Sequence, residues 1–266
     1  MTDSDPTLLD AAHAALSADP GNDALRLRFY ERLADGEMFL LLEREAAGEV
    51  LEPRIFPLES GPVVLVFDRE DRLAAFSAGG APYAALPGRV IAGFLKGQGI
   101  GLGVNLGVAP SEILLPAEAM DWLAGALDGG PEEAVARPEE FLRPEAPGAL
   151  VAALDAKFAR AGGLAAAALL AGVRWQDGRQ GHLLAFLDAR PGAEAALARA
   201  AREALVFSGV ETGHLDVIFL ATGDAALAPL VRVALRFDLP APEQPKAATA
   251  PLAPGRDPAM PPKLRW

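Results

Sequence analysis

The sequence predicts an α+β fold of two mixed, sandwich-like α/β domains with short strands, and three observations lead to that prediction. Apolar runs of strand length are mixed with segments of helical periodicity, and the two kinds do not alternate regularly. The chain has 266 residues, more than the usual size of one domain. An acidic, proline-rich stretch at residues 128–148 interrupts the patterned sequence. We therefore expect an N-terminal domain over residues 1–127, a linker over residues 128–148, and a C-terminal domain over residues 149–239.

The N-terminal domain begins with two predicted helices. The first ends at Asp19-Pro20-Gly21, and Asn22 is a residue type that caps the start of a second helix. Both segments carry an apolar stripe at helical spacing, which is Leu8, Leu9, Ala12 and Leu16 in the first and Leu25, Phe29 and Leu33 in the second.

Short strands are expected next. Residues 38–42 are too short and too continuously apolar for a helix, and residues 51–58 and 62–67 follow as two further strands. Asp68 is expected to cap a short helix, with Asp71 in the position of a capping-box acid. The remaining elements expected in this domain are a helix at 87–96, a strand at 97–107 with a short partner at 113–115, and a helix opened by Pro116.

The C-terminal domain is expected to hold a helix at 149–161, strands at 164–175 and 181–188, a helix after Pro191, a strand at 214–220 and a closing helix at 227–235. The Asp-Gly pair in the turn at residues 176–180 is typical of a hairpin. Pro229 must then lie in the first turn of the closing helix, where no hydrogen bond is lost.

The last part of the chain, residues 240–266, holds eight prolines in 27 residues and carries a net charge of +2. Because proline donates no hydrogen bond to a helix or a sheet, we expect an extended, disordered tail. Its final residues, Pro261-Pro262-Lys263-Leu264-Arg265-Trp266, fit a short docking peptide. A solubilising tail without a partner is the alternative.

Composition excludes several function classes. The chain has no cysteine, which removes disulfides, thiolate metal sites and cysteine nucleophiles. Its net charge of −12 disfavours nucleic acid or an anionic membrane surface as the main partner. The acidic N-terminus lacks the basic start of a secretory signal, and no apolar window reaches the roughly 18 residues of a membrane span. We expect a cytoplasmic protein.

Motifs for chemistry are scarce. The glycine run at residues 97–103 follows a predicted helix and does not fit the dinucleotide pattern G-x-G-x-x-G. Its expected use is a strand that allows close backbone approach, and we predict a ligand site there with polar contacts from Lys96, Gln98 and Asn105. No catalytic residue, metal site or cofactor is predicted. The alternative is an enzyme of unrecognised type that uses His182 or His214 with a neighbouring carboxylate.

Three segments together resemble the SseB family, the "enhanced serine sensitivity" proteins of bacteria. They are residues 29–39, residues 63–73 and residues 99–107, and Asn105-Leu106-Gly107 stands where many members have Asn-Pro-Gly. The resemblance spans about residues 20–238 and implies a two-domain architecture in the cytoplasm, with a link to serine or amino-acid metabolism through the family name. It implies no reaction, cofactor or catalytic set.

Taken together, these observations predict a non-enzymatic binding or regulatory protein of the SseB type, acting on a protein partner or a small-molecule ligand. They identify neither that partner nor the oligomeric state.

Overall fold

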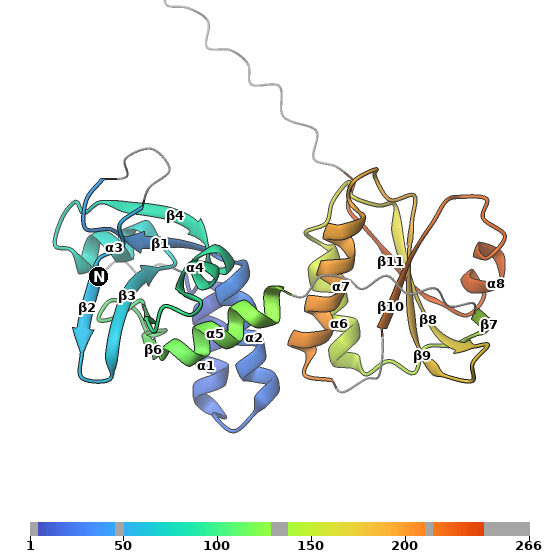
Figure 1. The fold of residues 1–266 in the computed structure, drawn as a ribbon, viewed down its shortest axis with the longest axis horizontal. Coiled ribbons are helices and arrows are strands. Elements are labelled where there is room, and N and C mark those ends of the chain that lie inside the picture. The colour runs from blue at the N-terminus through green and yellow to red at the C-terminus, as the bar shows by residue number, and fades with distance from the viewer. Residues whose placement is uncertain (1–4, 46–50, 129–137, 211–214, 242–266) are drawn as a thin grey trace, which may run out of the picture.

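The computed structural model describes residues 5–45, 51–128, 138–210 and 215–241, and these residues form two mixed sheets with helices (Figure 1). This arrangement confirms the predicted α+β class. The two sheets lie at opposite ends of the molecule, and helices from both halves face each other between them (Figure 1). The described part of the chain contains no helix with the length and apolar character needed to cross a membrane.

The first sheet has strand order β4-β1-β3-β5-β6, and β2 also pairs with β3. All of its pairings are antiparallel except β3 with β5, which is parallel. Its strands are β1 Glu37–Leu41, β2 Ile55–Leu58, β3 Gly61–Phe67, β4 Tyr83–Pro87, β5 Gly101–Val104 and β6 Ile113–Leu115. Since β3 and β5 are buried and central, they position the helices that follow them.

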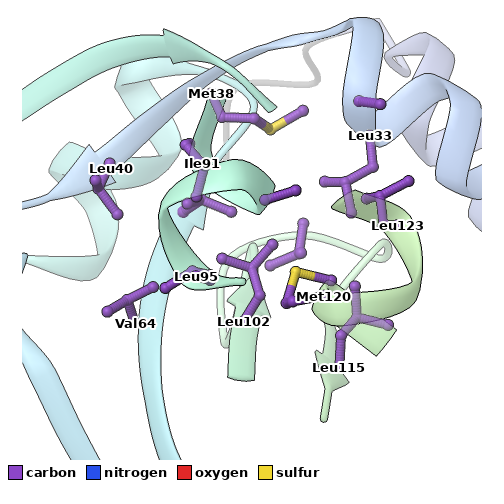
Figure 2. Packing of buried hydrophobic residues seen from close by; sticks show 14 of the residues in the cluster. Leu33, Met38, Leu40, Val64, Ile91, Leu95, Leu102, Leu115, Met120 and Leu123 are labelled. Carbon is purple, nitrogen blue, oxygen red and sulfur yellow. The ribbon is translucent and has the colours of Figure 1, made fainter. Parts of the chain in front are cut away.

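The helices of this half are α1 Leu8–Ala18, α2 Asp23–Asp35, α3 Glu70–Phe76, α4 Gly88–Leu95 and α5 Ala117–Asp128. Asn22 caps α2 as predicted, since its side chain accepts hydrogen bonds from the backbone N–H groups of the first turn. Figure 2 shows Ile91 and Leu95 of α4 and Met120 and Leu123 of α5 packed together over the sheet. The burial of these faces fixes which side of α5 remains available to solvent.

The second sheet has strand order β10-β9-β8-β11, and β7 also pairs with β8. Only β9 and β10 pair in parallel. Its elements are β7 Pro138–Leu142, α6 Gly148–Phe158, β8 Ala167–Trp175, β9 Gln180–Leu187, α7 Glu194–Ser208, β10 Leu215–Leu220, α8 Leu227–Val231 and β11 Leu235–Asp238. Because side chains alternate along a strand, Leu170 of β8 packs on the α6 and α7 side, and Leu169 packs on the α8 side.

Three local predictions are corrected. The expected closing helix at residues 227–235 is only the five-residue α8, and the chain then returns as β11 along β8, burying Phe237. The expected strand at residues 97–107 is limited to β5, because Gly97 and Gly99 adopt positive φ and form a turn. The helix after β3 starts at Glu70 without a side-chain cap, because the carboxylate of Asp68 binds Arg72 and Thr7 instead.

The structure also refines the expected linker. Residues 138–142 form β7 at the second sheet, and Gly148 opens α6, so this part of the proline-rich stretch joins the second half. Residues 129–137 and 242–266 lie outside the described residues, and with them most of the expected tail at 240–266.

Candidate functional site

The three predicted ligand contacts, Lys96, Gln98 and Asn105, do not come together. Lys96 and Gln98 lie on the surface in the turn after α4, and the Lys96 ammonium pairs with Asp128. Asn105 is fully buried beyond the opposite end of β5. The backbone of β5 is not exposed to a ligand, because pairing with β3 and β6 buries the strand.

Asn105 belongs to a buried polar cluster instead. Its side-chain oxygen accepts a hydrogen bond from the Asp68 backbone N–H at 3.1 Å, and its amide donates to the Ser111 hydroxyl at 2.9 Å. The Ser111 hydroxyl in turn donates to Asp10. Asn105 adopts a positive φ of 50°, a conformation that asparagine tolerates better than most residues. The amide therefore acts as a structural bridge between the sheet and the loop after β5.

Ion pairs of Arg72 with two aspartates complete this polar cluster. Arg72 forms two hydrogen bonds with Asp10, at 2.9 and 2.6 Å, and a third with Asp68 at 2.7 Å. Burial alone would raise the pKa of Asp10, but hydrogen bonds from Arg72 and Ser111 outweigh it and hold the pKa well below its usual range. A carboxylate stabilised in this way is a poor general base. The cluster ties α1 to the start of α3.

The histidines do not assemble a site among the described residues. His182 lies half-buried on β9, where its backbone neighbour on β10 is Leu215. His214 lies outside the described residues, and His13 packs its ring 5.9 Å from that of Phe29. Within the described ranges, no group of three or more His, Asp or Glu side chains could hold a metal ion.

A second buried ion cluster joins the two halves of the molecule. The Lys157 ammonium of α6 lies 2.8 Å from Asp35 of α2 and 3.0 Å from Glu203 of α7. Arg89 of α4 binds the same two carboxylates. Glu31, at 3.7 Å from Lys157, and Arg160, at 3.2 Å from Asp35, balance the charge. We call these six residues the junction cluster.

The junction cluster also shifts the pKa of one of its own acids, Asp35. Burial would raise the pKa of Asp35, but the hydrogen bonds and positive charges of Lys157 and Arg89 lower it below its ordinary value. Lys157 additionally lies over the ring of Phe207, 5.7 Å from its centre. Phe207 is a residue of α7 that packs into the core of the first half. Apolar packing and paired charges therefore hold the halves together at this position.

A concave surface near this junction is a groove between α2 and α5, with a volume of about 410 Å³. The α2 side presents four residues spaced at i, i+3, i+4 and i+7, which places them on one helix face. The lining consists of Asp23, Arg26, Leu27 and Tyr30 from α2 and Ala119 and Trp122 from α5. We call it the aromatic groove.

Two neighbouring aromatic rings, tilted at 54° to each other, characterise this groove. Because α5 turns Met120 and Leu123 into the core (Figure 2), Trp122 lies on the outer face, where 43% of it is exposed. Its ring centre is 5.1 Å from that of Tyr30 and 6.5 Å from that of Phe207. The row of rings thus continues from the open groove to the junction cluster.

Polar groups in and beside the aromatic groove favour recognition of hydrogen-bonding and basic groups. Burial raises the pKa of Tyr30, partly offset by the nearby charge of Arg26, so its hydroxyl stays protonated and can donate at neutral pH. Trp122 contributes an indole N–H donor. Asp23 forms a mostly exposed pair with Arg26, and exposed Glu118 lies one turn before Trp122 on the same side of α5.

The sequence contains one local signal for this groove. The helical spacing of Arg26 and Leu27 with Tyr30 marks a second face of α2, opposite its core face, but the pairing of that face with α5 depends on the tertiary fold.

Comparisons with protein-family models, curated proteins and solved structures gave no match for this chain. The resemblance to the SseB family therefore stays a prediction, and the function must be argued from the site itself.

Proposed function

We propose that this chain is a non-enzymatic binding protein whose aromatic groove accepts an extended, proline-containing peptide with basic residues. The observation that carries the proposal is the pair of neighbouring rings, Tyr30 of α2 and Trp122 of α5, which line one groove with centres 5.1 Å apart. The proposal keeps the predicted binding or regulatory role and moves its surface from residues 97–107 to the α2–α5 face.

The chemistry of the groove suits a polyproline II segment. Such segments dock on aromatic-lined grooves because proline rings stack on flat aromatic faces and the extended backbone loses little entropy on binding. A segment without internal backbone hydrogen bonds leaves its carbonyls free, and the Tyr30 hydroxyl and the Trp122 indole can donate to them. Both donors line the groove, Tyr30 from α2 and Trp122 from α5.

Charge supports a basic rather than an acidic peptide. Glu118 stands exposed beside Trp122, and the whole chain has a net charge of −12. These charges attract a cationic ligand and repel an anionic one, with an effect that salt weakens. Asp23 and Arg26 pair with each other at the groove, so neither adds much attraction for a charged ligand.

The test is a fluorescence-anisotropy titration of the full chain with a labelled hexaproline peptide that carries an arginine at each end. We expect saturable binding that Trp122→Ala abolishes and that Glu118→Gln weakens at low salt. Phe94→Ala is the matched control, because Phe94 is an aromatic residue of α4 that is 57% exposed and lies outside the groove. Equal binding by the wild type and by Trp122→Ala would refute the proposal.

A further inference from the structure

We infer that the C-terminal segment of the same chain, residues 242–266, is the resident occupant of the aromatic groove. This inference rests on the proposed function, because it names the ligand of that groove. The segment lies outside the described residues and begins directly after Ala241, the last described residue. It therefore meets the groove as a ligand attached to the protein.

The composition of the segment matches the groove. Seven of its 25 residues are proline, and it ends in Pro261-Pro262-Lys263-Leu264-Arg265-Trp266. The adjacent prolines supply rings for Trp122 and Tyr30, and Leu264 and Trp266 supply apolar side chains beside them. Such a ligand presents the same chemistry that the proposed function requires.

The charges of the two partners are also complementary. The segment carries +2, so the other 241 residues carry −14 of the total −12. Lys263 and Arg265 alternate with Leu264 and Trp266, so the last four residues combine two basic and two apolar side chains. Exposed Glu118, one turn before Trp122 on α5, is an acid beside the groove that can pair with these cations.

The chain is long enough to make this contact within one molecule. It leaves the second half beside the end of α6, where the Pro240 carbonyl accepts a hydrogen bond from the Gly163 backbone at 2.9 Å. An extended stretch from residue 242 to residue 258 spans about 50 Å at about 3.1 Å per residue. A compact chain of 266 residues has a radius of gyration of about 18 Å. The last nine residues can therefore reach a site on the other half.

Tethering makes the segment a competitor for any partner peptide. A flexible tether gives an effective concentration of about 1 mM, so even a segment with an intrinsic Kd of about 0.1 mM would occupy most grooves. A free peptide would then bind about tenfold more weakly to the intact chain than to a chain whose segment cannot dock. The segment would act as an autoinhibitory ligand that a stronger partner displaces.

Competition with the hexaproline–arginine probe tests this inference. We expect the full-length variant Pro261→Ala/Pro262→Ala to bind the probe about tenfold more tightly than the wild type. The matched control is Pro251→Ala/Pro254→Ala, which removes two prolines of the same segment away from its end and should leave the affinity unchanged. If both variants bind the probe like the wild type and binding still needs Trp122, the inference falls and the proposed function stands. If no variant binds the probe, both fall.

A distance measurement separates self-docking from exchange between copies. Because the chain has no cysteine, Ala259→Cys gives a single site for a nitroxide spin label. We expect the label to broaden the NMR signal of the Trp122 indole N–H and to spare that of buried Trp175. Broadening that occurs only between a labelled copy and an isotope-labelled unmodified copy would overturn docking within one molecule. No broadening of the Trp122 signal would overturn the inference altogether.

Discussion

Replacing Lys157 with methionine should destabilise the protein far more than the same change at a surface lysine. Lys157 is only 7% exposed, and Asp35 and Glu203 are 8% and 3% exposed, so these charges have little water to solvate them. Removing the cation leaves three buried acids, counting Glu31, against Arg89 and the more exposed Arg160. Breaking a buried ion pair from one side typically costs about 3–5 kcal/mol.

The remaining arginines place our expectation at the lower end, about 3 kcal/mol, which is on the order of a hundredfold in the ratio of folded to unfolded protein. The matched control is Lys96→Met. Its pair with Asp128 is 47% and 63% exposed, and such pairs contribute about 0–1 kcal/mol. Each variant removes one lysine that pairs with an aspartate, so the difference between the two losses of stability reports the effect of burial.

The assay is urea unfolding followed by circular dichroism and by tryptophan fluorescence, with the two signals compared for coincidence. Adding Asp35→Asn to Lys157→Met removes one of the excess carboxylates, so the double variant should be more stable than the sum of the two single effects predicts. The reasoning would be refuted if Lys157→Met and Lys96→Met lost the same stability, or if Lys157→Met were more stable than the wild type.

Two further predictions concern the first half. Gly88→Ala should destabilise the fold by more than about 2 kcal/mol, because its new methyl group would lie 1.9 Å from the Leu33 carbonyl oxygen of α2. In the same helix, the new methyl group of Gly93→Ala meets no atom within 4 Å, so this control should stabilise the fold by about 1 kcal/mol. Thermal unfolding measures both changes. Arg72→Met should destabilise the protein most at neutral pH. In the wild type Arg72 lowers the pKa of Asp10, so its contribution to stability is present above the unfolded pKa of about 3.9 and is lost as pH falls below that value. In the variant burial raises the Asp10 pKa. The stability gap to the wild type should therefore narrow as pH falls from about 7 to about 4 in urea titrations, and a constant gap would contradict this assignment.

The spacing of apolar residues was sufficient to predict those helices and strands whose pattern depends only on nearby residues in the sequence. The stripe through Phe29 and Leu33 and the cap at Asn22 predicted α2, and the continuous run at residues 63–67 predicted the central strand β3. These features depend on neighbours along the chain, and packing reinforced them.

Tertiary partners decided the elements that the pattern missed. Residues 235–238 form β11 because β8 offers a free backbone edge, although their spacing continues a helical stripe. Asp68 looks like a helix cap by sequence, but Arg72 and Thr7 compete for its carboxylate. The aromatic groove needs two helices far apart in sequence to lie side by side, so no single segment could reveal it.

Our central proposal is that the aromatic groove, with Tyr30 and Trp122, binds a proline-rich peptide. The most direct test is a fluorine NMR titration of the full chain labelled with 5-fluorotryptophan, using the hexaproline–arginine peptide. We predict that the resonance of Trp122 shifts in a saturable way and disappears from the spectrum of Trp122→Phe, and that the resonance of buried Trp175 stays fixed. A Trp122 resonance that does not move while the peptide binds would contradict the claim.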